Sequence, residues 1–175
     1  AIREFLEEIK FSEFNKKLDA GYPFSNMKEE LLEKYPLQQE LVRAFFERWM
    51  ECTGDAIQPT VDIMREVKAA GHPVYGLSNW SHETFPRLQH RYPFLPELDG
   101  YLLSGMVGVS KPDEEIFRIF LQRIDRQAED CVFIDDAMVN IEAANRVGFT
   151  GILFSSAPQL RVELEKIGVL DGHQS

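Results

Sequence analysis

The feature that most constrains the fold is a change of hydrophobic period near residue 58. From there to residue 167, stretches with helical spacing of apolar residues alternate with short β-rich runs. The predicted helices are 59–70, 82–91, 113–125, 139–147 and 158–167, and the predicted strands are 73–78, 100–104, 131–135 and 150–154. This alternation is typical of a parallel sheet with helices on both faces. The sequence therefore predicts an α/β core over residues 58–175.

The first 57 residues predict helices only. Their apolar residues recur at helical spacing in three stretches, which end at Gly21, Pro36 and Gly54. A helical subdomain over residues 1–57 is therefore expected to precede the α/β core.

Polar side chains stand where the predicted strands stop. In open α/β sheets the ligand crevice lies at the carboxyl ends of the strands. Ser78 and Asn79 end the first strand, Lys111 precedes a helix, and Asp135 and Asp136 end the third strand. A helix N-cap or a surface lysine explains each of the first three taken singly. Two adjacent carboxylates after a buried strand are harder to explain, because they repel each other and need a cation or solvent.

Together these side chains fit a site for a metal ion and a phosphoryl group. Carboxylate oxygens bind Mg²⁺, whereas hydroxyl, amide and ammonium groups hold phosphoryl oxygens. The chain carries 19 Lys and Arg against 29 Asp and Glu, a net charge of −10, which argues against a nucleic-acid or anionic-membrane surface. No apolar run approaches the roughly 20 residues of a membrane span. The expected cofactor is Mg²⁺ and the expected partner is a small phosphorylated molecule, with the oligomeric state left open.

The two cysteines, Cys52 and Cys131, match neither a disulfide framework nor a zinc-binding spacing. Such cysteine usage fits a reducing setting, and a cytoplasmic location is expected.

The stretches "GLSNWS", "GVSKPDEEIF" and "FIDDAMVNIEAANRVG" resemble, in this order, the second, third and fourth motifs of the haloacid dehalogenase-like (HAD) hydrolase superfamily, most of whose members are phosphatases. The resemblance implies a Rossmann-like core with a small helical cap. It implies that Ser78, with Asn79 beside it, binds the phosphoryl group and that Lys111 steadies the nucleophile and the phosphate. It also implies that Asp136 ligates Mg²⁺, with Asp135 as a second ligand or as an acceptor behind the metal's own ligands.

The family's first motif has no counterpart here. That motif is a strand that ends in Asp-x-Asp and supplies the nucleophile, and neither Asp19 nor Asp55 follows an apolar strand. We expect the nucleophile in a segment upstream of residue 1, about 20–40 residues long at roughly 3.3 Å per strand residue. In the family this strand lies between the strands that end here at Ser78 and Asp135. The sequence therefore predicts that those two strands do not hydrogen-bond to each other.

Three functions remain open at this point. The first is a Mg²⁺-dependent phosphatase of a small phosphomonoester that acts through an aspartyl-phosphate. The second is a 2-haloacid dehalogenase, which the adjacent Asp135 and Asp136 disfavour because two carboxylates without a cation repel an anionic haloacid. The third is a non-catalytic fragment that binds a phosphate-bearing ligand or a partner protein. Trp80 and Asn15 are candidate contacts to the organic part of a substrate.

Overall fold

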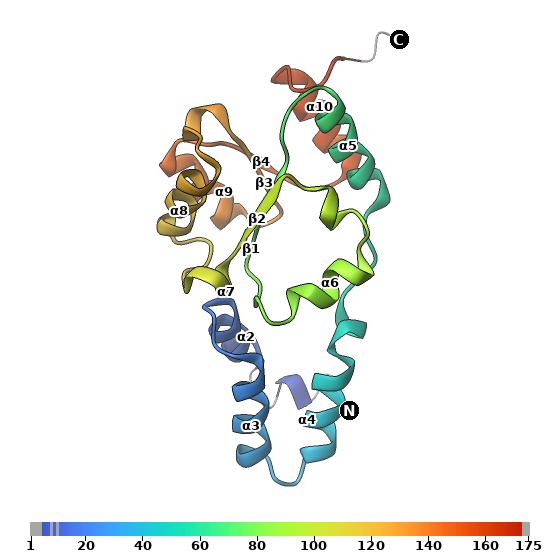
Figure 1. The fold of residues 1–175 in the computed structure, drawn as a ribbon, viewed down its shortest axis with the longest axis vertical. Helices are drawn as coiled ribbons and strands as arrows, with labels where there is room; N and C mark the ends of the chain where they lie inside the picture. Colours follow the sequence, from blue (N-terminus) through green and yellow to red (C-terminus); the bar gives the residue numbers. More distant parts are fainter. Residues whose placement is uncertain (1–4, 8, 10, 173–175) are drawn as a thin grey trace. The chain divides into compact units, whose positions relative to one another are not determined.

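The computed structural model describes residues 5–7, 9 and 11–172, and these group into two compact units (Figure 1). The first, here the helical unit, takes residues up to Asp55, Ser78–Pro93 and Leu103–Ser110; the second, here the sheet unit, takes Ala56–Leu77, Phe94–Leu102 and the residues from Lys111 onward. The predicted domains 1–57 and 58–175 stay a prediction, since compactness alone defines these units.

The helical unit is built from short helices on an apolar core. Its elements are α2 (Phe11–Asp19), α3 (Phe24–Lys34), α4 (Gln39–Arg48), η1 (Trp49–Cys52), α6 (Phe85–Arg91) and α7 (Ser104–Val107). Figure 1 shows α3 and α4 side by side, joined by a short turn. Met27 and Leu31, one helical turn apart on α3, are 0% exposed and pack in the same cluster as Val42 of α4. Apolar residues that recur at helical spacing thus lie on one face of their helix, and that face is buried.

The helices of the sheet unit begin and end close to their predicted positions. They are α5 (Gln58–Ala69), α8 (Glu114–Ile124), α9 (Met138–Val147) and α10 (Ala157–Lys166), with short 3₁₀ turns η2 (Leu95–Glu97) and η3 (Ala128–Asp130). Side-chain caps begin two of them: Asp113 accepts from Glu115 N at α8, and Ser156 accepts from Gln159 N at α10.

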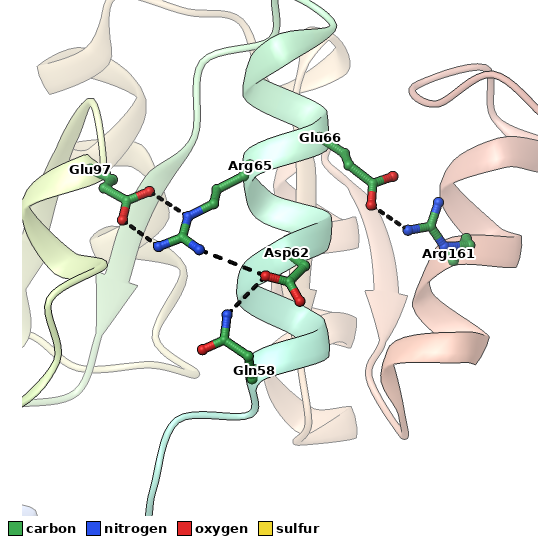
Figure 2. A network of polar contacts seen from close by, with 6 residues as sticks. All are labelled: Gln58, Asp62, Arg65, Glu66, Glu97 and Arg161. Atoms are coloured by element: carbon green, nitrogen blue, oxygen red, sulfur yellow. Dashed lines mark hydrogen bonds and ion pairs between the residues drawn. The ribbon is translucent and has the colours of Figure 1, made fainter.

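Exposed ion pairs connect α5 to its neighbours (Figure 2). Arg65 forms a two-pronged pair with Glu97 of η2, with Nη2 2.7 Å from Oε1. Arg161 of α10 donates to Glu66 of α5 at 2.7 Å. Pairs at this exposure add little to the free energy of folding.

The strands form two separate two-stranded sheets. β1 (Tyr75–Ser78) pairs with β2 (Gly100–Leu103), and β3 (Val132–Asp135) pairs with β4 (Thr150–Leu153) in parallel, with Val132 opposite Thr150. Among the described residues β1 has no strand partner besides β2, and β3 none besides β4. The prediction that β1 and β3 do not hydrogen-bond to each other is therefore confirmed, and the expected single sheet is divided in two.

A cavity of about 560 Å³, here the inter-strand slot, is lined by both β1 and β3. Val74, Tyr75 and Leu77 contribute one wall, and Val132, Phe133 and Ile134 contribute another. Ile63, Phe120 and Leu160 are among the apolar side chains that complete the lining. A strand that pairs along one edge only keeps the backbone N–H and C=O groups of its other edge for a further partner. The slot therefore offers an apolar space beside two strands that can each accept another neighbour.

Within the part of the chain that the structure describes, no helix combines the length and the apolar character needed to cross a membrane.

Candidate functional site

A buried ion pair joins the carboxyl ends of β1 and β3. Lys111 Nζ lies 2.7 Å from Asp135 Oδ2, and the two side chains are only 10% and 8% exposed. The same ammonium group donates to Leu77 O at 2.9 Å. Leu77 directly precedes Ser78 in the chain. The structure thus brings together two of the predicted site residues, Lys111 and Asp135, and fixes a cation beside the last residues of both strands.

Both oxygens of the Asp135 carboxylate accept hydrogen bonds from the protein. Oδ2 accepts from Lys111, whereas Oδ1 accepts from Ala137 N and from Asn140 Nδ2, each at 2.9 Å. Burial by itself raises the pKa of Asp135, but the bonds from Lys111, Asn140 and Ala137 outweigh it and hold that pKa below its ordinary value. Asp135 is therefore ionised at neutral pH and suited to orient Lys111.

Asp136 has the opposite environment, because its side chain is exposed. Among the described residues, no three His, Cys, Asp or Glu side chains are grouped so that they could hold a metal ion. Mg²⁺ commonly takes only one or two protein carboxylates and keeps several waters, so an exposed aspartate beside a buried cation–carboxylate pair fits as one ligand. The assignment of Asp136 as a Mg²⁺ ligand therefore stays a prediction, and the described residues alone do not complete the coordination of the ion.

The loop after β1 is held in place by hydrogen bonds within the helical unit. Ser78 ends β1, and Asn79 and Trp80 follow it, all three half-buried. Trp80 N donates to Ser104 Oγ at 2.9 Å, and the ring of Trp80 lies 5.2 Å from that of Trp49. Sequence reasoning gave Ser104 no role, because a single serine after a strand carries no pattern of its own.

Asn15, the candidate contact from the helical subdomain, lies on α2. Its side chain is exposed, and its Nδ2 donates to Asp19 Oδ2 one turn further along the helix, at 3.2 Å. This local bond fits a solvated helix face as well as it fits a substrate contact. The assignment of Asn15, like that of Trp80, therefore stays a prediction.

Two curated relatives resemble parts of the chain. It is 30% identical over 105 residues to the sesquiterpene phosphatase of Aspergillus oryzae, which covers 60% of this chain and 54% of that protein. It is 35% identical over 94 residues to the drimenol cyclase of Aspergillus calidoustus, which covers 54% of this chain and 18% of that protein. The matched region thus spans about half or less of the length of these relatives.

Solved structures share the fold. A HAD family enzyme from Bacteroides thetaiotaomicron, in complex with magnesium and inorganic phosphate, superposes with a TM-score of 0.72 at 18% identity, over 89% of this chain and 83% of that one. A HAD family hydrolase from Deinococcus radiodurans R1, with bound phosphate and sodium, gives a TM-score of 0.60 at 19% identity, over 86% and 79%. At these identities the likeness establishes the fold alone.

A family model described as haloacid dehalogenase-like hydrolase matches residues 3–148, which include all three stretches around Ser78, Lys111 and Asp136. This match extends over most of the chain. The protein therefore belongs to the haloacid dehalogenase-like hydrolases, with their α/β fold.

Proposed function

We propose that the protein is a Mg²⁺-dependent phosphatase that acts on a small phosphomonoester. The observation that carries this proposal is the Lys111–Asp135 pair, which holds an ammonium group at the ends of β1 and β3. A phosphoryl group carries negative charge on its oxygens throughout its transfer, and a fixed cation in a water-poor site stabilises that charge.

The remaining candidates take complementary roles. The Ser78 hydroxyl and the Asn79 amide donate to phosphoryl oxygens, and the exposed Asp136 carboxylate contributes to Mg²⁺ binding. Bound Mg²⁺ would supply charge neutralisation for the phosphoryl group. Trp80 and Asn15 are proposed to contact the organic part of the ester.

The attacking carboxylate is proposed to come from a further strand that occupies the inter-strand slot. Such a strand would lie between β1 and β3 and would end near Lys111, which contacts Leu77, the penultimate residue of β1, and Asp135, the last residue of β3. The predicted segment upstream of residue 1 would provide it. The carboxylate would attack phosphorus, release the alcohol, and then lose the phosphoryl group to water.

One curated relative, 30% identical to this chain, is a phosphatase, and this supports phosphate chemistry. Two structural neighbours were crystallised with phosphate, one of them also with magnesium, but at 18% and 19% identity they support the fold alone. A neighbour described as a dehalogenase has a TM-score of 0.57 at 16% identity, so it shares the fold and does not decide the reaction.

The test is an assay of the protein that carries the upstream segment. We expect hydrolysis of p-nitrophenyl phosphate that requires Mg²⁺ and stops in EDTA. Release of halide from a 2-haloacid in EDTA, with no phosphate release, would establish the dehalogenase alternative. If neither reaction occurs while inorganic phosphate still binds, the chain is the non-catalytic ligand-binding protein.

A further inference from the structure

Two consecutive residues of α7 take up both backbone polar groups of Trp80. Ser104 Oγ accepts from Trp80 N at 2.9 Å, and Gly105 N donates to Trp80 O at 3.1 Å. Ser104 is 0% exposed, so its hydroxyl lies in the interior of the helical unit. A third bond, between His82 Nδ1 and Gly105 O at 2.9 Å, extends the same contact to the far side of the loop. Two short segments, far apart in sequence, are thus held together over residues 80–82.

Gly105 permits this contact because it has no side chain. A Cβ atom at position 105 would lie 2.9 Å from both His82 N and Trp80 O, and 3.0 Å from Ser81 Cα. Real Cβ atoms essentially never approach other atoms under 3.0 Å, and all three of these neighbours are backbone atoms, which cannot swing aside. Any side chain at position 105 would therefore displace the loop.

The contact lies immediately beyond the residues proposed to bind phosphate. Ser78 belongs to β1 and is held by the strand, while the Trp80 peptide is held by Ser104 and Gly105. Only Asn79 separates these two fixed points. A single residue between two anchors has little freedom in its backbone dihedrals, so the backbone that carries the Ser78 and Asn79 side chains keeps one geometry.

We propose that Ser104 and Gly105 are positioning residues for phosphate binding: they hold the Trp80 peptide, and so set the geometry of Ser78 and Asn79. This inference rests on the proposed phosphatase function. Its physical basis is pre-organisation, because a loop already in the binding geometry loses less conformational entropy when the phosphoryl group arrives.

The experiment compares two variants with two matched controls. Ser104→Ala removes the acceptor of Trp80 N–H, and Gly105→Ala displaces the same loop while the Ser104 hydroxyl remains. Ser156→Ala also removes a serine hydroxyl that accepts from a backbone N–H. This serine caps the start of α10, and its donor is Gln159 N. Gly54→Ala adds a methyl group where no atom lies within 4 Å. Thermal unfolding of all four variants corrects the binding data for loss of folded protein.

The measured quantity is the affinity for inorganic phosphate in the presence of Mg²⁺, by titration calorimetry on the folded protein that carries the upstream segment. We expect Ser104→Ala and Gly105→Ala each to weaken binding by about tenfold, since phosphate binding must then order about one backbone residue that the contact already orders in the wild type. Both controls should bind phosphate like the wild type. If the two loop variants bind as tightly as Ser156→Ala at equal folded fraction, Ser104 and Gly105 have a structural role only and the inference is wrong.

A measurement on the wild-type protein covers the case in which Ser104→Ala does not fold. If the contact and the phosphate site are coupled, phosphate must strengthen the contact by the same factor by which the contact strengthens phosphate binding. Saturating phosphate should therefore slow hydrogen exchange of the Trp80 amide, followed by NMR, more than that of the Gln159 amide. Equal effects on both amides would overturn the inference while phosphate binding itself stands. A wild type that binds no phosphate with Mg²⁺ would instead overturn the proposed function, and the inference with it.

Discussion

At the scale of single residues, the Lys111–Asp135 pair combines a stabilising and a chemical role. Two charges with 10% and 8% exposed side chains are costly to bury, and each is tolerable only because the other is present. Asn140 and Ala137 donate hydrogen bonds to the second oxygen of the Asp135 carboxylate. Removing one charge should therefore affect the fold before it affects any reaction.

Replacing Lys111 tests this dependence. Lys111→Ala leaves the Asp135 carboxylate buried without its counter-ion, and we expect the free energy of unfolding to fall by about 3–5 kcal/mol. Urea denaturation measures this loss. Lys166→Ala is the matched control, because it breaks the exposed Lys166–Glu163 pair and should cost less than about 1 kcal/mol. Equal losses in both variants would show that the Lys111 pair is no stronger than a surface pair.

The pH dependence of stability should report on Asp135. Its pKa is lower in the folded protein than in the unfolded chain, so the folded state holds the proton less tightly. The stabilisation that follows from this lower pKa is fully present above the Asp pKa of the unfolded chain, about 3.9. It is lost as the pH falls through the pKa of Asp135 in the folded protein. Urea denaturation of Asp135→Asn from pH 7 downward should show a smaller acid-induced loss than the wild type. Parallel curves for the two proteins would contradict this account.

The metal role of Asp136 is tested separately. Asp136→Asn replaces a charged oxygen ligand by a neutral amide, so Mg²⁺ affinity should fall. Changes to residues that only support metal ligands cost about 10–100-fold, and a direct ligand should cost at least as much. Titration calorimetry with Mg²⁺ measures the change, and Asp130→Asn, an exposed aspartate before β3, is the control. Unchanged Mg²⁺ affinity would remove Asp136 from the proposed metal site.

At the scale of elements, the slot between β1 and β3 is the feature that links fold and reaction. Each of these strands has four residues, so a matching partner would extend over about 13 Å at roughly 3.3 Å per residue. The mostly apolar lining favours apolar side chains on such a partner. Its carboxyl end would meet the Lys111 ammonium, which favours an acidic residue there.

A synthetic peptide provides the test. A short β-branched peptide that ends in aspartate should bind the protein and raise its melting temperature, because it pairs with two strand edges at once. NMR should show the largest amide shifts at 74–77 and 132–134. The control has the same composition with a central proline, which cannot donate to a ladder. If both peptides bind equally well, the slot does not select a strand.

Helix and strand positions were predictable because their causes are local. The helix predicted over 59–70 is found at Gln58–Ala69, and the strand predicted over 131–135 is found at Val132–Asp135. The spacing of apolar residues, together with the residues that begin or end a helix, determines where such elements start and stop. The Trp80–Ser104 bond and the division of the Asp135 oxygens between three donors were not predictable. Both depend on which segments meet in three dimensions, which no local pattern contains.

At the scale of the whole molecule, each unit has a buried core of its own. In the helical unit this core is centred on Phe45, Phe46 and the α3 residues Met27 and Leu31. In the sheet unit, Ile152, Leu160 and Leu164 belong to another cluster. Separate cores allow the two units to lose structure at different concentrations of denaturant.

The two tryptophans make this testable, since Trp49 and Trp80 both belong to the helical unit. Leu31→Ala should lower the free energy of unfolding that tryptophan fluorescence reports by about 2–5 kcal/mol, because it leaves a cavity in the core of the helical unit. Leu160→Ala, of comparable burial in the sheet unit, should leave the fluorescence transition in place and shift only the part of the circular dichroism signal that comes from the sheet unit. Identical shifts of both signals in both variants would show that the protein unfolds in one step.

The chain passes from one unit to the other after Asp55, Leu77, Pro93, Leu102 and Ser110. Neither unit is therefore encoded by one uninterrupted stretch of sequence. A recombination event that exchanges a single contiguous segment cannot transplant either unit whole. Laboratory chimaeras face the same restriction, and fusion points after Asp55, Pro93 or Ser110, which lie between elements, should preserve more folded protein than fusion points inside α3 or α9.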